Sequence, residues 1–158
     1  MDDTELTHLR AAIALAAEAR AQGRHPFAAL VVDGRGRVIS TAMNNSRPPS
    51  GDPTQHAELC AVGAAARTVR PDELADATLF TSAEPCAMCA GAVYWTGVGR
   101  VVYALSESRL LELTGDNPEN PTFALPCREV FARGQRAIEV HGPLLEEEAA
   151  VPHIGFWK

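Results

Sequence analysis

The sequence predicts a three-layer α/β/α sandwich around a central mixed five-stranded sheet, in one domain spanning residues 1–158. Three observations predict this fold. Five strand-like apolar runs occur along the chain, helical patterns alternate with them, and no linker, internal repeat or low-complexity tract divides the sequence. A sheet whose strands alternate with helices is covered on both faces. A chain of 158 residues with 46% apolar residues can bury such a core.

The chain begins with a predicted helix and hairpin. Apolar residues recur at helical spacing over residues 5–21, and Gly23 follows as a stop signal. The runs "FAALVV" and "RVISTAM" flank "DGRG", a turn signal. We therefore expect a β-hairpin over residues 27–44.

The middle of the chain alternates helix, strand and helix. After the loop "NSRPPSGDP", Asp52 or Thr54 is expected to cap a helix over residues 55–69. The run "ATLFTS" predicts a buried strand at residues 77–82. A second helix is expected over residues 87–95, directly after a proline and a cysteine.

The last third of the chain is less regular. "RVVYAL" predicts a strand at residues 100–105, and "AIEVHG" resembles a last strand at residues 137–142. Residues 106–134 combine a short helical pattern with a loop rich in Gly, Asn and Pro. Residues 143–158 form a C-terminal segment that ends in large aromatic residues.

Charge and composition make several classes of function and location less favourable than others. The net charge is −6 and no cluster of Lys or Arg occurs, which disfavours a nucleic-acid partner. The sequence has no signal peptide and no apolar run long enough to span a membrane, so we expect a cytoplasmic protein. Four cysteines, two of them as Cys-x-x-Cys, fit a reduced compartment and a metal better than a disulfide framework.

Three residues have the spacing of a zinc site. His56, Cys86 and Cys89 supply a Cys₂His ligand set, which in catalytic zinc sites leaves the fourth position open for water. The two cysteines stand at i and i+3 at the start of a helix, where both sulfurs face one point and thiolates are favoured. Glu58 would point roughly 200° away from His56 in a continuous helix, but at a fraying first turn it can approach the water. It is then the candidate general acid and base.

Other interpretations of these residues stay open. The Cys-x-x-Cys pair can belong to the core, and Cys60, at i+4 from His56, can close the site as a fourth ligand of a structural zinc. Pro85 and Glu58 favour an open, catalytic site over both of these interpretations.

The same residues carry a family resemblance. "HAE" followed by "SAEPCAMCAGAVYW" resembles the cytidine deaminase superfamily, in its branch of guanine deaminases and tRNA adenosine deaminases. The blocks "HPFAALVVDGRG", "MNNS" and "DPTQHAE" are similar to that branch as well. The likeness covers most of the chain and departs after Leu105.

The resemblance implies zinc-dependent hydrolytic deamination and a set of substrate contacts. It gives Glu58 the proton transfer between the water, a ring nitrogen and the departing ammonia. An Asn at the position of Asn44 binds base or sugar in relatives, and a Phe at the position of Phe27 lies against the ring. The backbone N–H groups of Ala57 and Glu84 are further candidates, and so is Trp95 as a cavity-lining ring. Phe27 and Trp95 can instead be core residues, and Asn44 can instead be a turn residue.

Several substrates are compatible with the sequence. The tail "GPLLEEEAAVPHIGFWK" is acidic where tRNA editors are usually basic, which favours a small free base, guanine first and then cytosine or an amino-triazine. A tRNA-specific adenosine deaminase also fits the motifs, and so does a non-catalytic, zinc-stabilised binding module.

The C-terminal segment and the ligand helices carry the remaining predictions. Phe156 and Trp157 are expected to close the site as a lid, over their own chain or a neighbour's. Asp116 is a weaker candidate for accepting N–H bonds from a guanine-like edge. Small residues in the ligand helices, together with the resemblance, predict a homodimer, with exchange of C-terminal segments as one arrangement.

Overall fold

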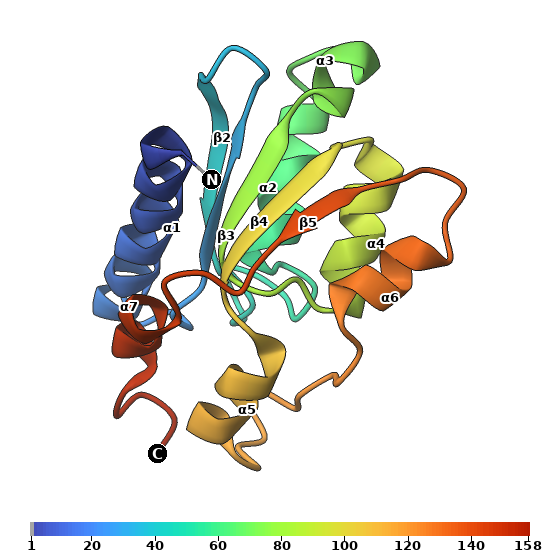
Figure 1. Ribbon diagram of the computed structural model, residues 1–158. Coiled ribbons are helices and arrows are strands. Elements are labelled where there is room, and N and C mark those ends of the chain that lie inside the picture. The colour runs from blue at the N-terminus through green and yellow to red at the C-terminus, as the bar shows by residue number, and fades with distance from the viewer. Residues whose placement is uncertain (1) are drawn as a thin grey trace.

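The computed structural model describes residues 2–158 and contains one mixed sheet between two layers of helices, as Figure 1 shows. The strands are β1 (Ala28–Val32), β2 (Val38–Met43), β3 (Thr78–Ala83), β4 (Arg100–Leu105) and β5 (Glu139–His141). Their order in the sheet is β2-β1-β3-β4-β5. β1 pairs antiparallel with β2 and β3, whereas β3, β4 and β5 are parallel. The predicted α/β/α sandwich with a mixed five-stranded sheet is confirmed.

The helices divide between the two faces of the sheet. α1 (Asp3–Ala21) and the short α7 (Glu146–Ala150) cover one face (Figure 1). The other face carries α2 (Ala57–Ala66), α4 (Ala87–Thr96) and α6 (Cys127–Ala132), with α2 packed on α4 and α4 on α6. The remaining elements are α3 (Pro71–Ala75), α5 (Glu107–Thr114) and a 3₁₀ turn (Val151–His153).

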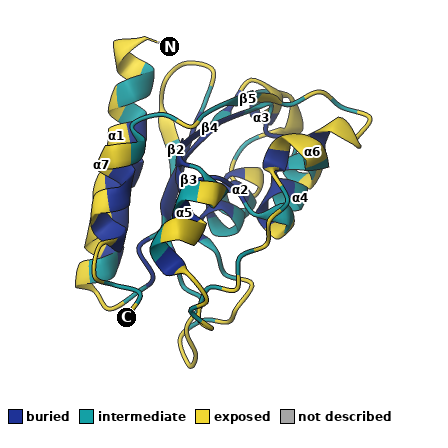
Figure 2. Cartoon of the chain, turned by 60° about the horizontal axis from the view of Figure 1, so that its bottom comes forward, coloured by how far each residue is buried: buried dark blue, intermediate teal, exposed yellow. Residues whose placement is uncertain are grey.

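The central strands are rich in apolar residues because both of their faces are covered by helices. In β1, Leu30 belongs to the core under α1, and Val31 belongs to the core under α2. β3 alternates in the same way, with Leu79 on the α2 side and Phe80 on the α1 side. Figure 2 shows that one side of α1 is buried and faces the sheet, whereas its outer side is exposed. Continuous apolar runs of this length are typical of strands covered on both faces.

Local side-chain bonds set where the first elements begin and turn. α1 begins at Asp3, two residues before the predicted start, because the Asp2 carboxylate accepts from the Glu5 backbone N–H at 2.8 Å and the Glu5 carboxylate accepts from that of Asp2 at 3.0 Å. The predicted hairpin is confirmed. Asp33 accepts backbone N–H bonds within its turn, and Gly36 adopts the left-handed conformation, with φ 82°.

The predicted cap of the second helix was wrong. We expected Asp52 or Thr54 to cap a helix from residue 55, but α2 begins at Ala57 with His56 as its N-cap residue. The Asp52 carboxylate instead accepts the Thr54 backbone N–H at 2.8 Å and a bond from the Gln55 side chain. Asp52 therefore forms a turn before the helix, and this turn leaves His56 in an extended conformation.

The region after β4 contains more helix than the sequence predicted. α5 and α6 lie at the two ends of residues 106–134, joined by a loop over residues 115–126. The three consecutive glutamates of the C-terminal segment open α7. None of the helices within residues 2–158 is long and apolar enough to cross a membrane.

Candidate metal centre and active-site cavity

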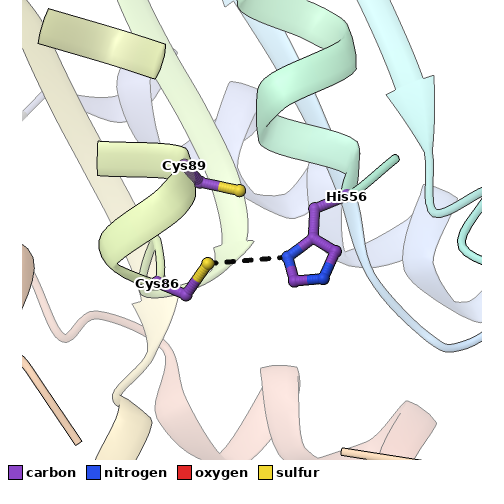
Figure 3. Close-up of side chains that lie close together, drawn as sticks. All are labelled: His56, Cys86 and Cys89. Atoms are coloured by element: carbon purple, nitrogen blue, oxygen red, sulfur yellow. Dashed lines mark hydrogen bonds between the residues drawn. The ribbon is translucent and has the colours of Figure 1, made fainter. Parts of the chain in front are cut away.

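The three predicted metal ligands meet where two helices begin. His56 is the N-cap residue of α2, Cys86 is the N-cap residue of α4, and Cys89 lies in the first turn of α4. Their ligand atoms all lie within 4.8 Å of one another, and Cys86 Sγ lies 3.6 Å from His56 Nδ1. Figure 3 shows the three side chains pointing toward one another. Neither N-cap side chain bonds to its own helix, so both are available as ligands.

This donor set fits zinc. Zinc–sulfur and zinc–nitrogen bonds of about 2.0–2.3 Å hold ligand atoms within roughly 4 Å of one another, which agrees with the spacing of the three side chains. Two thiolates and one imidazole form a catalytic zinc ligand set with a place for water. Within residues 2–158 the cluster comprises His56, Cys86 and Cys89, and Cys60 is outside it. The closed site with Cys60 as a fourth ligand is therefore not supported.

The protonation of the ligands also suits a metal. The hydrogen bond with Cys89, together with that to His56, lowers the pKa of the Cys86 thiol to about 4. The hydrogen bond with Cys86, in which the two sulfurs share one proton, raises the pKa of the Cys89 thiol, and burial raises it further. The hydrogen bond with Cys86 raises the pKa of His56. The cluster thus carries a thiolate at neutral pH, and a bound cation would take the place of the proton that Cys86 and Cys89 share.

Glu58 lies beside the ligands. It is 5% exposed, and its Oε2 lies 3.8 Å from Cys89 Sγ. Because His56 is extended rather than helical, the angle that separates the two residues in a continuous helix does not apply, and both line one cavity. Burial raises the pKa of Glu58 to about 7. A carboxyl group with such a pKa can both accept and donate a proton near neutral pH.

Two of the metal ligands, His56 and Cys86, lie with Glu58 in the wall of a cavity of about 660 Å³, and Cys89 is fully buried beside them. Its wall is built from three parts of the chain. The first is the segment from His25 to Arg47, the second comprises the starts of α2 and α4, and the third is the stretch from Glu107 to Phe123. Most of the exposed surface of the wall is apolar, although about half of its side chains are polar or charged, and an apolar surface with polar groups is usual for a small-molecule site.

Three of the predicted substrate contacts lie in this wall or beside it. Phe27 and Asn44 both line the cavity. Asn44 is 3% exposed, and its Oδ1 accepts from the backbone N–H and the hydroxyl of Ser46, at 3.0 and 2.7 Å. These bonds fix the orientation of the Asn44 amide, and its N–H group remains as a donor. Ala57 is buried at the first position of α2, where a backbone N–H has no partner within the helix.

Glu84 lines the cavity too, but not in the predicted way. Its backbone N–H donates to the carbonyl of Leu105 at 2.7 Å. This N–H was expected to hold the substrate, and its bond to β4 makes that interpretation wrong.

The structure places four other predicted residues outside the cavity wall. Trp95 is 85% exposed on the outer side of α4, where it packs on Tyr94. Asp116 is exposed at the start of its loop. Phe156 and Trp157 pack behind the wall, against its residue His25, with ring centroids 5.9 and 5.1 Å away. The tail therefore does not cover its own cavity.

Sequence reasoning missed a charged group at the cavity mouth. His25 Nε2 lies 3.0 Å from Glu119 Oε2, and the Arg47 guanidinium donates to the same oxygen at 2.8 Å. Burial lowers the pKa of His25, and the hydrogen bond with Glu119 opposes this. Glu107 also lines the cavity, and burial raises its pKa to about 7. Two of these residues had a signal in the sequence, because His25 opens the block "HPFAALVVDGRG" and Glu119 stands in the polar loop from which Asp116 was chosen.

A Cys₂His cluster beside a buried carboxyl group, at the wall of a cavity, defines a zinc-dependent hydrolytic enzyme. The comparison with known families gives the particular class. Residues 2–105 match the family described as the cytidine and deoxycytidylate deaminase zinc-binding region. The chain belongs to this family and is a zinc-dependent hydrolytic deaminase.

Relatives support this assignment along the whole chain. A probable cytosine deaminase of Schizosaccharomyces pombe is 43% identical over 157 residues, which are 99% of this chain and 94% of the relative. Guanine deaminase of Bacillus subtilis is 38% identical over 112 residues, which are 70% of each chain. A solved structure of guanine deaminase from Nitrosomonas europaea is 31% identical, with a TM-score of 0.74, covering 93% of this chain and 81% of that one.

Proposed function

We propose that this protein deaminates a free nucleobase and that guanine is its substrate. The choice of a free base as the substrate rests on the carboxylate of Glu119 at the cavity mouth. Its bonds to His25 and Arg47 both end on Oε2, which leaves Oε1 for a substrate N–H group. A free base has a ring N–H at the position that a nucleoside joins to its sugar. Glu119 therefore favours a base over a nucleoside.

The cavity has room for a purine. A volume of about 660 Å³ admits a two-ring base easily, and a single pyrimidine ring leaves more of the space unfilled. Phe27, Leu110 and Phe123 give the wall flat or apolar surfaces against which an aromatic ring packs.

The side chains divide the work of hydrolysis. When bound by His56, Cys86 and Cys89, zinc supplies a Lewis acid that activates water. Glu58 takes one proton from the attacking water and delivers it to a ring nitrogen, and it then carries the second proton from the resulting hydroxyl group to the amino group, which leaves as ammonia. Asn44 donates an N–H bond to the base, and Phe27 packs on its ring. The exocyclic C–N bond breaks, and a carbonyl group takes its place.

A comparison of four substrates tests this function. Ammonia release is measured with guanine, cytosine, guanosine and cytidine, and with Glu119→Gln beside the wild type. We expect the highest kcat/KM with guanine, low activity with both nucleosides, and a reduced preference for bases in Glu119→Gln. Equal activity on a base and its nucleoside would contradict the role of Glu119.

Cytosine is the second candidate, because a relative that is 43% identical over nearly the whole chain is a probable cytosine deaminase. A kcat/KM higher for cytosine than for guanine decides in its favour. A tRNA substrate is disfavoured by the net charge of −6 and by the exposed glutamates Glu147 and Glu148 in the first turn of α7.

The protein forms a homodimer in this proposal. Trp95 and Met88 are large apolar residues exposed on α4, and Gly91 lies between them on the same helix. Exposed apolar residues on a helix rich in small side chains suit close packing against a second copy.

The C-terminal segment, residues 143–158, supports the site from behind. His153 and Trp157 pack on Phe27, with ring centroids 5.1 and 6.0 Å away, and Phe27 lines the cavity. Arg20 on α1 holds this segment by donating to the carbonyls of Pro152 and Ile154, at 2.9 and 2.6 Å. The tail thus fixes a wall of the cavity and does not need to close over it.

A further inference from the structure

One carboxylate connects the metal-ligand loop to the cavity wall that follows β4. Glu84 is buried beyond the end of β3, and only Pro85 separates it from the ligand Cys86. Its Oε2 accepts the backbone N–H of Glu107 at 3.1 Å, and its Oε1 accepts that of Cys127 at 3.1 Å. Each oxygen of this side chain therefore holds a different part of the backbone.

The two N–H groups stand at the first positions of α5 and α6. N–H groups at the start of a helix have no acceptor within the helix, and a negative charge there is favoured by the helix dipole. The N-cap residue of α6 is Pro126, whose side chain makes no capping bond. Glu84 supplies the acceptor that this proline lacks, and a bond from N–H to carboxylate is stronger than one between neutral groups.

The stretch between the two N–H groups is the third part of the cavity wall. It carries Glu107, Leu110, Glu119 and Phe123. The backbone N–H of Glu84 also donates to Leu105, the last residue of β4 before this stretch. Glu84 thus holds the place where the wall leaves the sheet and the place where it returns to α6.

We propose that Glu84 is a positioning residue, which sets how far the wall of residues 107–126 lies from the metal ligands and so determines how tightly the substrate binds. Its effect falls on the substrate and not on the metal, because the carboxylate bonds to the wall and not to His56, Cys86 or Cys89. This proposal depends on the proposed function only in the choice of guanine and cytosine as the substrates with which it is tested.

Glu84→Gln is the first test. Glutamine keeps one acceptor oxygen and turns an NH₂ group toward the other backbone N–H, so one of the two bonds is lost. We expect KM for guanine and for cytosine to rise by about tenfold, the effect of one charge-assisted hydrogen bond, with a smaller fall in kcat. Zinc stays at one per chain. The matched control is Glu112→Gln, an exposed glutamate on α5 outside the cavity, which leaves KM unchanged. An unchanged KM in Glu84→Gln, or a loss of zinc, overturns the proposal.

Amide hydrogen exchange in the wild type tests the contacts without any substrate. The first N–H of a helix normally exchanges fast because it has no partner in the helix. We expect the amides of Glu107 and Cys127 to exchange more slowly than that of Ser108, the next residue of α5, and to become faster in Glu84→Gln. Fast exchange of both amides in the wild type overturns the proposal, whichever base the enzyme deaminates.

Discussion

Replacing Glu58 with Gln tests the proton transfer at the centre of the site. Glutamine is close in size to glutamate and fits a position that is 5% exposed, but its amide cannot take a proton from water. His56, Cys86 and Cys89 are unchanged in this variant, so the zinc site remains complete. We expect a folded, zinc-loaded protein with little activity.

The size of the loss follows from the isolation of Glu58. A general acid–base group contributes about 10² to 10⁴ in rate, or roughly 3–5 kcal/mol of barrier at about 1.4 kcal/mol for each factor of ten. Burial keeps bulk water away from the Glu58 carboxylate, so little solvent can replace it in the proton transfer. We therefore expect kcat to fall by at least about a hundredfold.

Three measurements are made on the same sample of Glu58→Gln. Ammonia release is followed with the free base that the wild type deaminates fastest, zinc is measured per chain, and the melting temperature reports the fold. Glu112→Gln, on the surface of α5, is the matched control and keeps wild-type turnover. Unchanged turnover in Glu58→Gln refutes the reasoning, and so does a loss of zinc in parallel with the activity.

Four further outcomes are expected. Cys60→Ala keeps one zinc per chain by metal analysis, because Cys60 lies outside the ligand cluster; a stoichiometric loss of zinc would make it a ligand. Deletion of residues 152–158 lowers the melting temperature and the activity per folded molecule together, because the tail supports a cavity wall; full activity in the folded fraction would make the tail only an anchor. Leu79→Ala lowers the free energy of unfolding by about 2–5 kcal/mol in denaturant titrations, whereas the control Leu111→Ala, which is 43% exposed, changes it by about 0.5 kcal/mol or less; equal effects would contradict the assigned core. Sedimentation at micromolar concentration shows a dimer that Trp95→Glu weakens, and a single species near 16.9 kDa for the wild type would exclude it.

The metal centre was predictable because its spacing is local. Cys86 and Cys89 stand three residues apart and together indicate zinc. A catalytic zinc site also needs a third ligand and a general acid–base group, and His56 and Glu58 are residues of the right types for these two roles. The pair of His25 and Glu119 was not predictable, because its members lie 94 positions apart and no motif of the sequence links them. Their contact is made by the loop after α5, where the sequence has no periodic pattern to place it.

Errors in the predicted contacts also have physical causes. Trp95 was expected near the cavity because its helix carries ligands, but α4 is apolar on every side, and such a pattern does not show which side faces the sheet. Phe156 and Trp157 were expected to be covered, and they are half-buried. What covers them is α1 and the back of the cavity wall, which no local pattern indicates.

The two backbone hydrogen bonds of the Glu84 carboxylate have a consequence for how such enzymes diversify. Both contacts of its carboxylate go to backbone N–H groups, so they do not depend on which side chains stand at Glu107 and Cys127, as long as neither is proline. The family match ends at residue 105, just before the stretch that these contacts hold. Evolution or a designer can therefore exchange the residues between the two N–H groups for another recognition loop while the catalytic half of the protein stays the same. A graft that preserves these two attachment points is the natural first step toward changing which base the enzyme accepts.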